Sequence, residues 1–135
     1  MDKGIDPQIW LSQAQLELSV AKHLENAFLP KPLEIICFHA QQTAEKAIKA
    51  VILHTASDKP IVKSHDLSIL LDSIDRDICP FDEKFYDYAD ELFPYSVATR
   101  YPSHLQDSID EYKTKQAISH AEEILNWAIF IVQGV

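Results

Sequence analysis

Glycine is scarce in this chain, which has two glycines among its 135 residues. Tight hairpins depend on glycine, so this scarcity argues against a β-rich fold and favours an all-helical one. The two cysteines are too few for a disulfide framework. No apolar run approaches the ~20 residues of a membrane-spanning helix, and the N-terminus lacks the charged-then-apolar pattern of a secretion signal. These absences predict a cytoplasmic protein that does not enter a membrane.

Positive charge is also scarce, since 12 basic residues face 21 acidic ones and the net charge is −9. That balance argues against sequence-independent binding of nucleic acid over the whole surface. The charge is unevenly spread, however. Residues 46–65 carry four lysines and one acid, whereas residues 66–111 carry twelve acids and three basic residues. A ligand with a phosphate group would be drawn to the first stretch and repelled by the second.

The apolar residues recur at helical spacing through most of the chain, and no repeat or linker divides residues 1–135 into more than one domain. Proline and capping residues mark the ends of five expected helices. Ser64 is expected to cap the third helix, and Ser108 with Glu111 to form a capping box for the last one. The sequence therefore predicts an all-α, up-and-down bundle. Its helices are expected at about 7–28, 32–56, 64–74, 81–94 and 108–132.

Three polar clusters interrupt this apolar pattern. The first has three- and four-residue spacings that place its members along one side of a helix. The second stands at an expected helix start, and the third lies in a break between helices. In order, they are Gln41, Gln42, Glu45, Lys46 and Lys49; Lys63, Ser64, His65, Asp66 and Leu67; and Thr99, Arg100, Tyr101, Pro102, Ser103 and His104.

Each cluster also has a plain structural explanation. Glu45 and Lys49 can form a surface salt bridge worth a few tenths of a kcal/mol, and His65 can be an ordinary first-turn residue. Arg100 can pair with one of the many acids near it in the sequence. A buried pair of Glu45 and Arg100 that holds the loop to the bundle is the strongest purely structural explanation for the whole set.

Taken together, the order and separation of the clusters resemble the HEPN family (higher eukaryotes and prokaryotes nucleotide-binding domain). The likeness extends from Trp10 to about Trp127. It implies a helical bundle that forms a homodimer, needs no cofactor and binds a nucleotide or RNA. It also implies a possible partner, a small nucleotidyltransferase, in a toxin–antitoxin-like pair.

For a binding module, the resemblance and the residue chemistry together suggest a set of site residues. Arg100 is a permanently charged, bidentate donor suited to phosphate. The ring of Tyr101 can stack on a base, or alternatively pack against the core. The expected ligand-binding residues are Lys46, Lys49, His65, Arg100 and Tyr101, and the expected organising residues are Gln42, Glu45 and Lys63.

Two alternatives remain open. The chain can be a metal-independent HEPN endoribonuclease in which His104 moves a proton and Arg100 stabilises the charge on the phosphorane. The family's nuclease motif has about four to six residues between its arginine and histidine, whereas this chain has three between Arg100 and His104. It can also be a non-catalytic dimeric interaction protein. No metal site is expected, because the six histidines lack the i, i+4 pairing with a carboxylate partner that is typical of metal-binding helices.

Overall fold

The computed structural model describes residues 6–56, 63–96 and 108–134. Within these ranges the chain is helical and contains no strand, as the composition predicted. No helix in them combines the length and the apolar character needed to cross a bilayer. The elements are α1 (Pro7–Ala27), α2 (Leu33–Thr55), α3 (Leu67–Asp72), α4 (Lys84–Leu92), the 3-10 helix η1 (Phe93–Ser96) and α6 (Glu111–Gln133).

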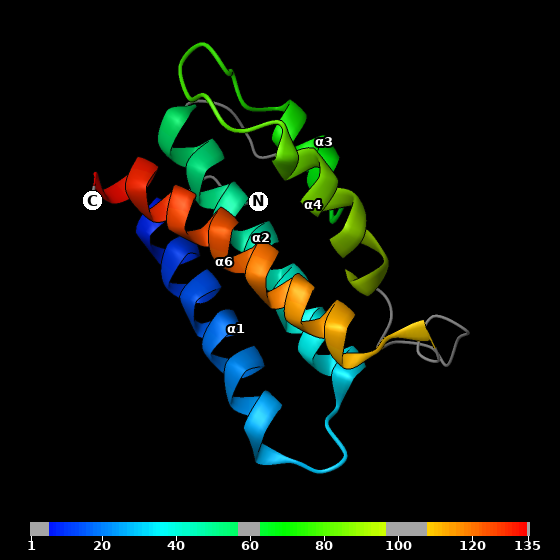
Figure 1. Cartoon of the computed structure of the whole chain (residues 1–135). Helices are drawn as coiled ribbons and strands as arrows, with labels where there is room; N and C mark the ends of the chain where they lie inside the picture. The colour runs from blue at the N-terminus through cyan, green and yellow to red at the C-terminus, as the bar shows by residue number, and fades with distance from the viewer. Residues whose placement is uncertain (1–5, 57–62, 97–107, 135) are drawn as a thin grey trace.

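Helix α2 lies at the centre of the bundle. It contacts α1 and α6 on one side and α3, α4 and η1 on the other. Figure 1 shows the long helices α1, α2 and α6 side by side, with α3 and α4 beyond α2. Along the chain, α1, α2, α4 and α6 run in alternating directions, as expected for an up-and-down bundle, so that α2 and α6 are parallel to each other.

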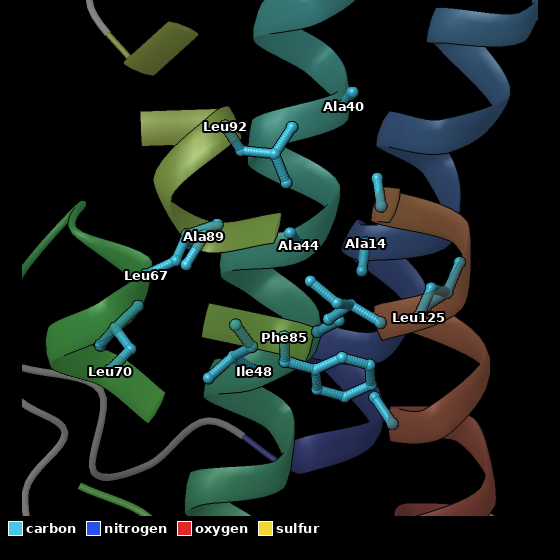
Figure 2. Packing of buried hydrophobic residues seen from close by; sticks show 14 of the residues in the cluster. Ala14, Ala40, Ala44, Ile48, Leu67, Leu70, Phe85, Ala89, Leu92 and Leu125 are labelled. Atoms are coloured by element: carbon cyan, nitrogen blue, oxygen red, sulfur yellow. The ribbon is translucent and has the colours of Figure 1, made fainter. Parts of the chain in front are cut away.

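Small residues allow α2 to lie close to its neighbours. Ala40, Ala44 and Ala47 on α2 are fully buried, as is Ala14 on α1. Larger side chains from α3 and α4, such as Leu67, fill the other face of α2 (Figure 2). Helix α2 is enclosed on most sides, and in its middle part the residues that stay partly accessible are the polar His39, Gln42 and Lys46.

The caps of two helices differ from the prediction, and α4 begins at Lys84 rather than at 81. Asp66 caps α3, since its Oδ1 accepts a hydrogen bond from the Ser68 amide at 3.0 Å, whereas Ser64 accepts one from the Asp66 amide in the turn before the helix. Asp110 caps α6 in place of Ser108. In both cases an aspartate two residues further along the chain takes the capping position, which aspartate fills as well as serine does.

Candidate functional site

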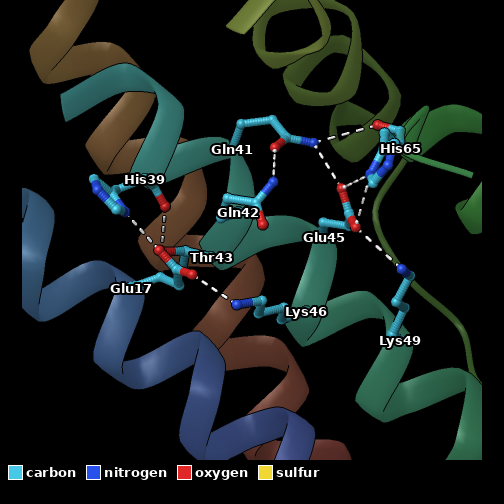
Figure 3. Close-up of polar contacts among 9 residues, drawn as sticks. All are labelled: Glu17, His39, Gln41, Gln42, Thr43, Glu45, Lys46, Lys49 and His65. Atoms are coloured by element: carbon cyan, nitrogen blue, oxygen red, sulfur yellow. Dashed lines mark hydrogen bonds and ion pairs between the residues drawn. The ribbon is translucent and has the colours of Figure 1, made fainter. Parts of the chain in front are cut away.

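A network of polar side chains on α2 centres on a buried carboxylate. Glu45 is 3% exposed, and three side chains hydrogen-bond to it (Figure 3). Gln41 Nε2 lies 3.1 Å from Oε1, Lys49 Nζ lies 3.0 Å from Oε2, and His65 Nδ1 lies 3.0 Å from Oε1. The i, i+4 pair of Glu45 and Lys49 that the spacing allowed is therefore formed, but it is buried rather than on the surface.

The amides of α2 extend this network to the segment before α3. Gln41 Nε2 also donates to the backbone carbonyl of His65 at 3.3 Å, and Gln42 Nε2 donates to Gln41 Oε1 at 2.9 Å. His65 is thus held at both its side chain and its backbone by residues of α2. The network holds the start of α3 against α2.

Burial and hydrogen bonding act in opposite directions on Glu45. Burial by itself would raise the pKa of this carboxyl group. The hydrogen bond from His65, the charge of Lys49 and the bond from Gln41 outweigh it, so the Glu45 pKa lies below its ordinary value of 4.5. Glu45 is therefore a carboxylate at neutral pH.

A second cluster, which also contains a glutamate, a lysine and a histidine, joins α2 to α1. Glu17 of α1 accepts from Lys46 Nζ at 2.6 Å and contacts His39 Nδ1 at 2.6 Å, as Figure 3 shows. These three side chains are 17–25% exposed. Each cluster therefore contains one carboxylate, one lysine and one histidine that meets the carboxylate through Nδ1.

The two lysines are already engaged by these clusters. Lys49 is 9% exposed, and its Nζ lies 5.2 Å from the centre of the Trp10 ring as well as 3.0 Å from Glu45. Lys46 is paired with Glu17. Two carboxylates thus balance the charge of the two lysines, and the net charge of the clusters depends on whether their histidines are protonated.

The structure divides the predicted site residues of the described ranges between the two clusters. Glu45, Lys49 and His65 meet in the first, which Gln42 joins through Gln41, and Lys46 belongs to the second with Glu17. Lys63 is exposed two residues before His65. The third predicted cluster, Arg100, Tyr101 and His104, lies outside the described residues. The roles assigned to all of these residues stay predictions.

Two members of the clusters, Glu17 and His39, were not predicted from the sequence. Glu17 falls three residues after Ala14 and four before Ala21, so it shares the spacing of the buried stripe of α1. His39, Gln42, Lys46 and Lys49 are spaced by three or four residues along α2. The sequence therefore held a signal for this cluster: Glu17 occupies a position of the buried face of α1, and the basic residues of α2 are spaced along one face of the next helix.

A cavity of about 360 Å³ lies elsewhere, between η1 with the end of α4 and the start of α6. Its walls include Leu92, Tyr95, Tyr112 and His120. None of the predicted site residues in the described ranges lines it. Across those same ranges, no three histidine, cysteine or acidic side chains come together in a way that could hold a metal ion.

Comparison with known proteins supports the fold and shows the family. The structure resembles the crystal structure of TT1696 from Thermus thermophilus, with a TM-score of 0.73 and 23% identity over 90% of this chain and 94% of that one. It is similarly close to ST0689, described as an archaeal HEPN homologue, with a TM-score of 0.70 and 23% identity over 91% and 94% of the two chains. No curated protein sequence gives a significant match. The sequence matches the HEPN domain over residues 7–131, and the chain belongs to the HEPN family.

Proposed function

We propose that this protein is a HEPN-type binding module for a nucleotide or RNA. We propose further that it acts as a homodimer with a small nucleotidyltransferase as its partner protein. The observation that carries the binding proposal is the network around Glu45, which presents the exposed ring of His65 at the surface. Burying charged groups costs several kcal/mol of desolvation, and apolar residues of similar volume often stabilise a core equally well. A buried ionic network that ends in an exposed imidazole therefore fits a site better than it fits a core.

The charge distribution favours the same face. The segment from 46 to 65 is the basic part of an otherwise acidic chain. Lys63 adds an exposed ammonium near His65, and Arg100 is proposed as the main phosphate contact because guanidinium binds phosphate in a bidentate manner. Within this proposal Gln42 and Glu45 organise the site, and Tyr101 offers a ring for base stacking. Lys46 and Lys49, the other expected ligand contacts, carry positive charge that Glu17 and Glu45 largely offset.

The direct test is fluorescence anisotropy with labelled nucleotides and a short single-stranded RNA at low salt. Arg100→Ala should weaken binding by about tenfold or more, since a charge-assisted hydrogen bond contributes about 1.5–3 kcal/mol. Arg76→Ala is the matched control, because Arg76 is the only other arginine in the chain and pairs with Glu83. No binding by the wild type would contradict the proposal.

The same samples separate binding from catalysis. If the protein is a metal-independent endoribonuclease, the wild type will shorten the RNA in the presence of EDTA and His104→Ala will not. If it only binds, the RNA will remain intact with both proteins. If it is only a dimeric interaction protein, Arg100→Ala will change the oligomeric state or melting temperature while neither protein binds RNA.

A further inference from the structure

We propose that His65 is a protonation-dependent phosphate contact of this module, with Nε2 meeting a phosphate oxygen and the buried Glu45 acting as its positioning residue through Nδ1. This inference rests on the proposed function and deepens it. It assigns the ligand contact to one atom of one ring. It also makes the affinity for ligand depend on a proton that this ring carries.

The geometry shows a surface ring that is held in one place. Nδ1 of His65 lies 3.0 and 3.2 Å from the two oxygens of Glu45, and the His65 carbonyl accepts from Gln41. The residues on either side are held as well, since the Asp66 amide donates to Ser64 Oγ at 3.0 Å. Even so, the His65 side chain is 61% exposed. Holding an exposed side chain costs rotamer entropy, but a preorganised ring binds a ligand without that loss.

The ionised carboxylate of Glu45 determines which nitrogen of the His65 ring carries a hydrogen. An ionised carboxylate can only accept hydrogen bonds, so Nδ1 of His65 must carry a hydrogen. Nε2 is then the ring nitrogen that is left to meet a ligand. When protonated, Nε2 donates to a phosphate oxygen; when neutral, it presents a lone pair that such an oxygen avoids.

The charges around His65 are nearly balanced, so a proton on its ring changes how strongly this surface attracts an anion. The charged groups around the imidazole are Glu45 and Lys49 from α2, with Lys63 and Asp66 from its own segment. Lys49 is balanced by Glu45 and lies against Trp10, so it contributes little to attracting an anion. Protonation of His65 therefore adds a net positive charge where a ligand can reach it.

The competing explanation is that the pair only fastens the start of α3 to α2. Two substitutions each keep one of the two ring positions. The amide nitrogen of asparagine can replace Nδ1 as the donor to Glu45, but His65→Asn has no group at Nε2. In His65→Gln the amide instead reaches the position of Nε2 and leaves Glu45 without that donor. A purely structural role predicts that His65→Asn behaves as wild type in every assay.

The experiment measures the affinity for a short fluorescein-labelled single-stranded RNA at pH 5.5 and pH 8.0, at one low ionic strength. Wild type should bind about tenfold more tightly at pH 5.5, the effect of one charge-assisted hydrogen bond. His65→Asn should lose most of this difference while keeping a melting temperature near that of wild type. Because the chain has five other histidines, His23→Asn serves as the control: His23 is exposed on α1, and this variant should keep the full pH dependence.

The outcomes distinguish this inference from the proposed function. If the wild type binds RNA and His65→Asn binds it equally at both pH values, the inference is overturned and the proposed function stands. If the wild type binds neither the RNA nor a labelled nucleotide, the proposed function fails, and inorganic phosphate then decides the inference. A saturable change in the His65 ring NMR signals on adding phosphate at pH 6 supports the contact, and no change rejects it. That titration needs no variant, so it also decides the matter if His65→Asn does not fold.

Discussion

The Oε1 atom of Glu45 and the Nδ1 atom of His65 lie 3.0 Å apart, although the side chain of Glu45 is 4% exposed and that of His65 is 61% exposed. This hydrogen bond connects a charge inside the bundle to a ring on its surface. The carboxylate also receives Lys49 and Gln41, so each side chain of the network limits the positions of the others. The stability of the bundle and the chemistry of the proposed site therefore depend on the same carboxylate.

Removing the charge of Glu45 should destabilise the protein. In Glu45→Gln the ammonium of Lys49 stays buried without a counterion, and breaking a buried ion pair typically costs about 3–5 kcal/mol. We expect the free energy of unfolding, measured with urea, to fall by about 3 kcal/mol. Glu122→Gln is the control, because its ion pair with Lys22 is exposed and should contribute under about 1 kcal/mol. Equal effects of the two substitutions would show that the Glu45 network does not stabilise the fold.

Acid should remove the contribution of Glu45. Its pKa in the folded protein is lowered from 4.5, so the folded state favours the carboxylate and this stabilisation is fully present above about pH 4.5. It is lost as the pH falls through the folded-state pKa, where the carboxyl group takes up a proton. Urea unfolding between pH 7 and pH 3 should show the difference between wild type and Glu45→Gln shrinking towards low pH. A difference that stays constant would contradict this assignment.

Glu17 and Lys46 should be energetically coupled across the contact between α1 and α2. Their side chains are 2.6 Å apart and only 17–20% exposed. A double-mutant cycle with Glu17→Gln and Lys46→Met should give a coupling of about 1 kcal/mol. The same cycle on the more exposed pair Lys84 and Glu123 should give only about 0.3 kcal/mol. A larger coupling at the exposed pair would be the opposite of what burial predicts.

The close approach of α2 to its neighbours should not tolerate a larger side chain. Ala44 is fully buried within the packed cluster of Figure 2, so Ala44→Leu must displace its surroundings. Overpacking of this kind typically costs about 1–3 kcal/mol, which thermal or urea unfolding would detect. Ala27→Leu places the same side chain at the exposed end of α1 and should change stability by under about 0.5 kcal/mol. A stable Ala44→Leu variant would mean that α2 has room that the packing does not show.

Local sequence features were enough to predict the helices but not all of their ends. The apolar spacing and Pro7 placed α1 correctly, because both act within a few residues. Ser64 and Ser108 are the predicted caps, whereas Asp66 and Asp110 cap the helices in the structure. All four residues have capping side chains, so the choice depends on where packing lets each helix begin.

Of the contacts in the candidate site, the sequence predicted only those between residues of one helix. Glu45 and Lys49 share α2, so their spacing was sufficient to pair them. The contact of Glu17 with Lys46 depends on how α1 and α2 are rotated against each other, which spacing along one helix does not determine. The burial of Lys49 likewise follows from the packing of α1 and Trp10 beside it. The third predicted cluster, with Arg100, lies outside the described residues.

Nitrogen NMR of the imidazole rings, recorded with and without a short RNA, is the measurement that tests the proposed role of His65. The nitrogen shifts of free His65 should show a hydrogen on Nδ1, as the bond to ionised Glu45 requires. Adding RNA at pH 6 should shift the Nε2 signal of His65 and leave that of the exposed His23 unchanged. A hydrogen on Nε2 with a bare Nδ1, or a His65 signal that saturating RNA leaves unmoved, would contradict it.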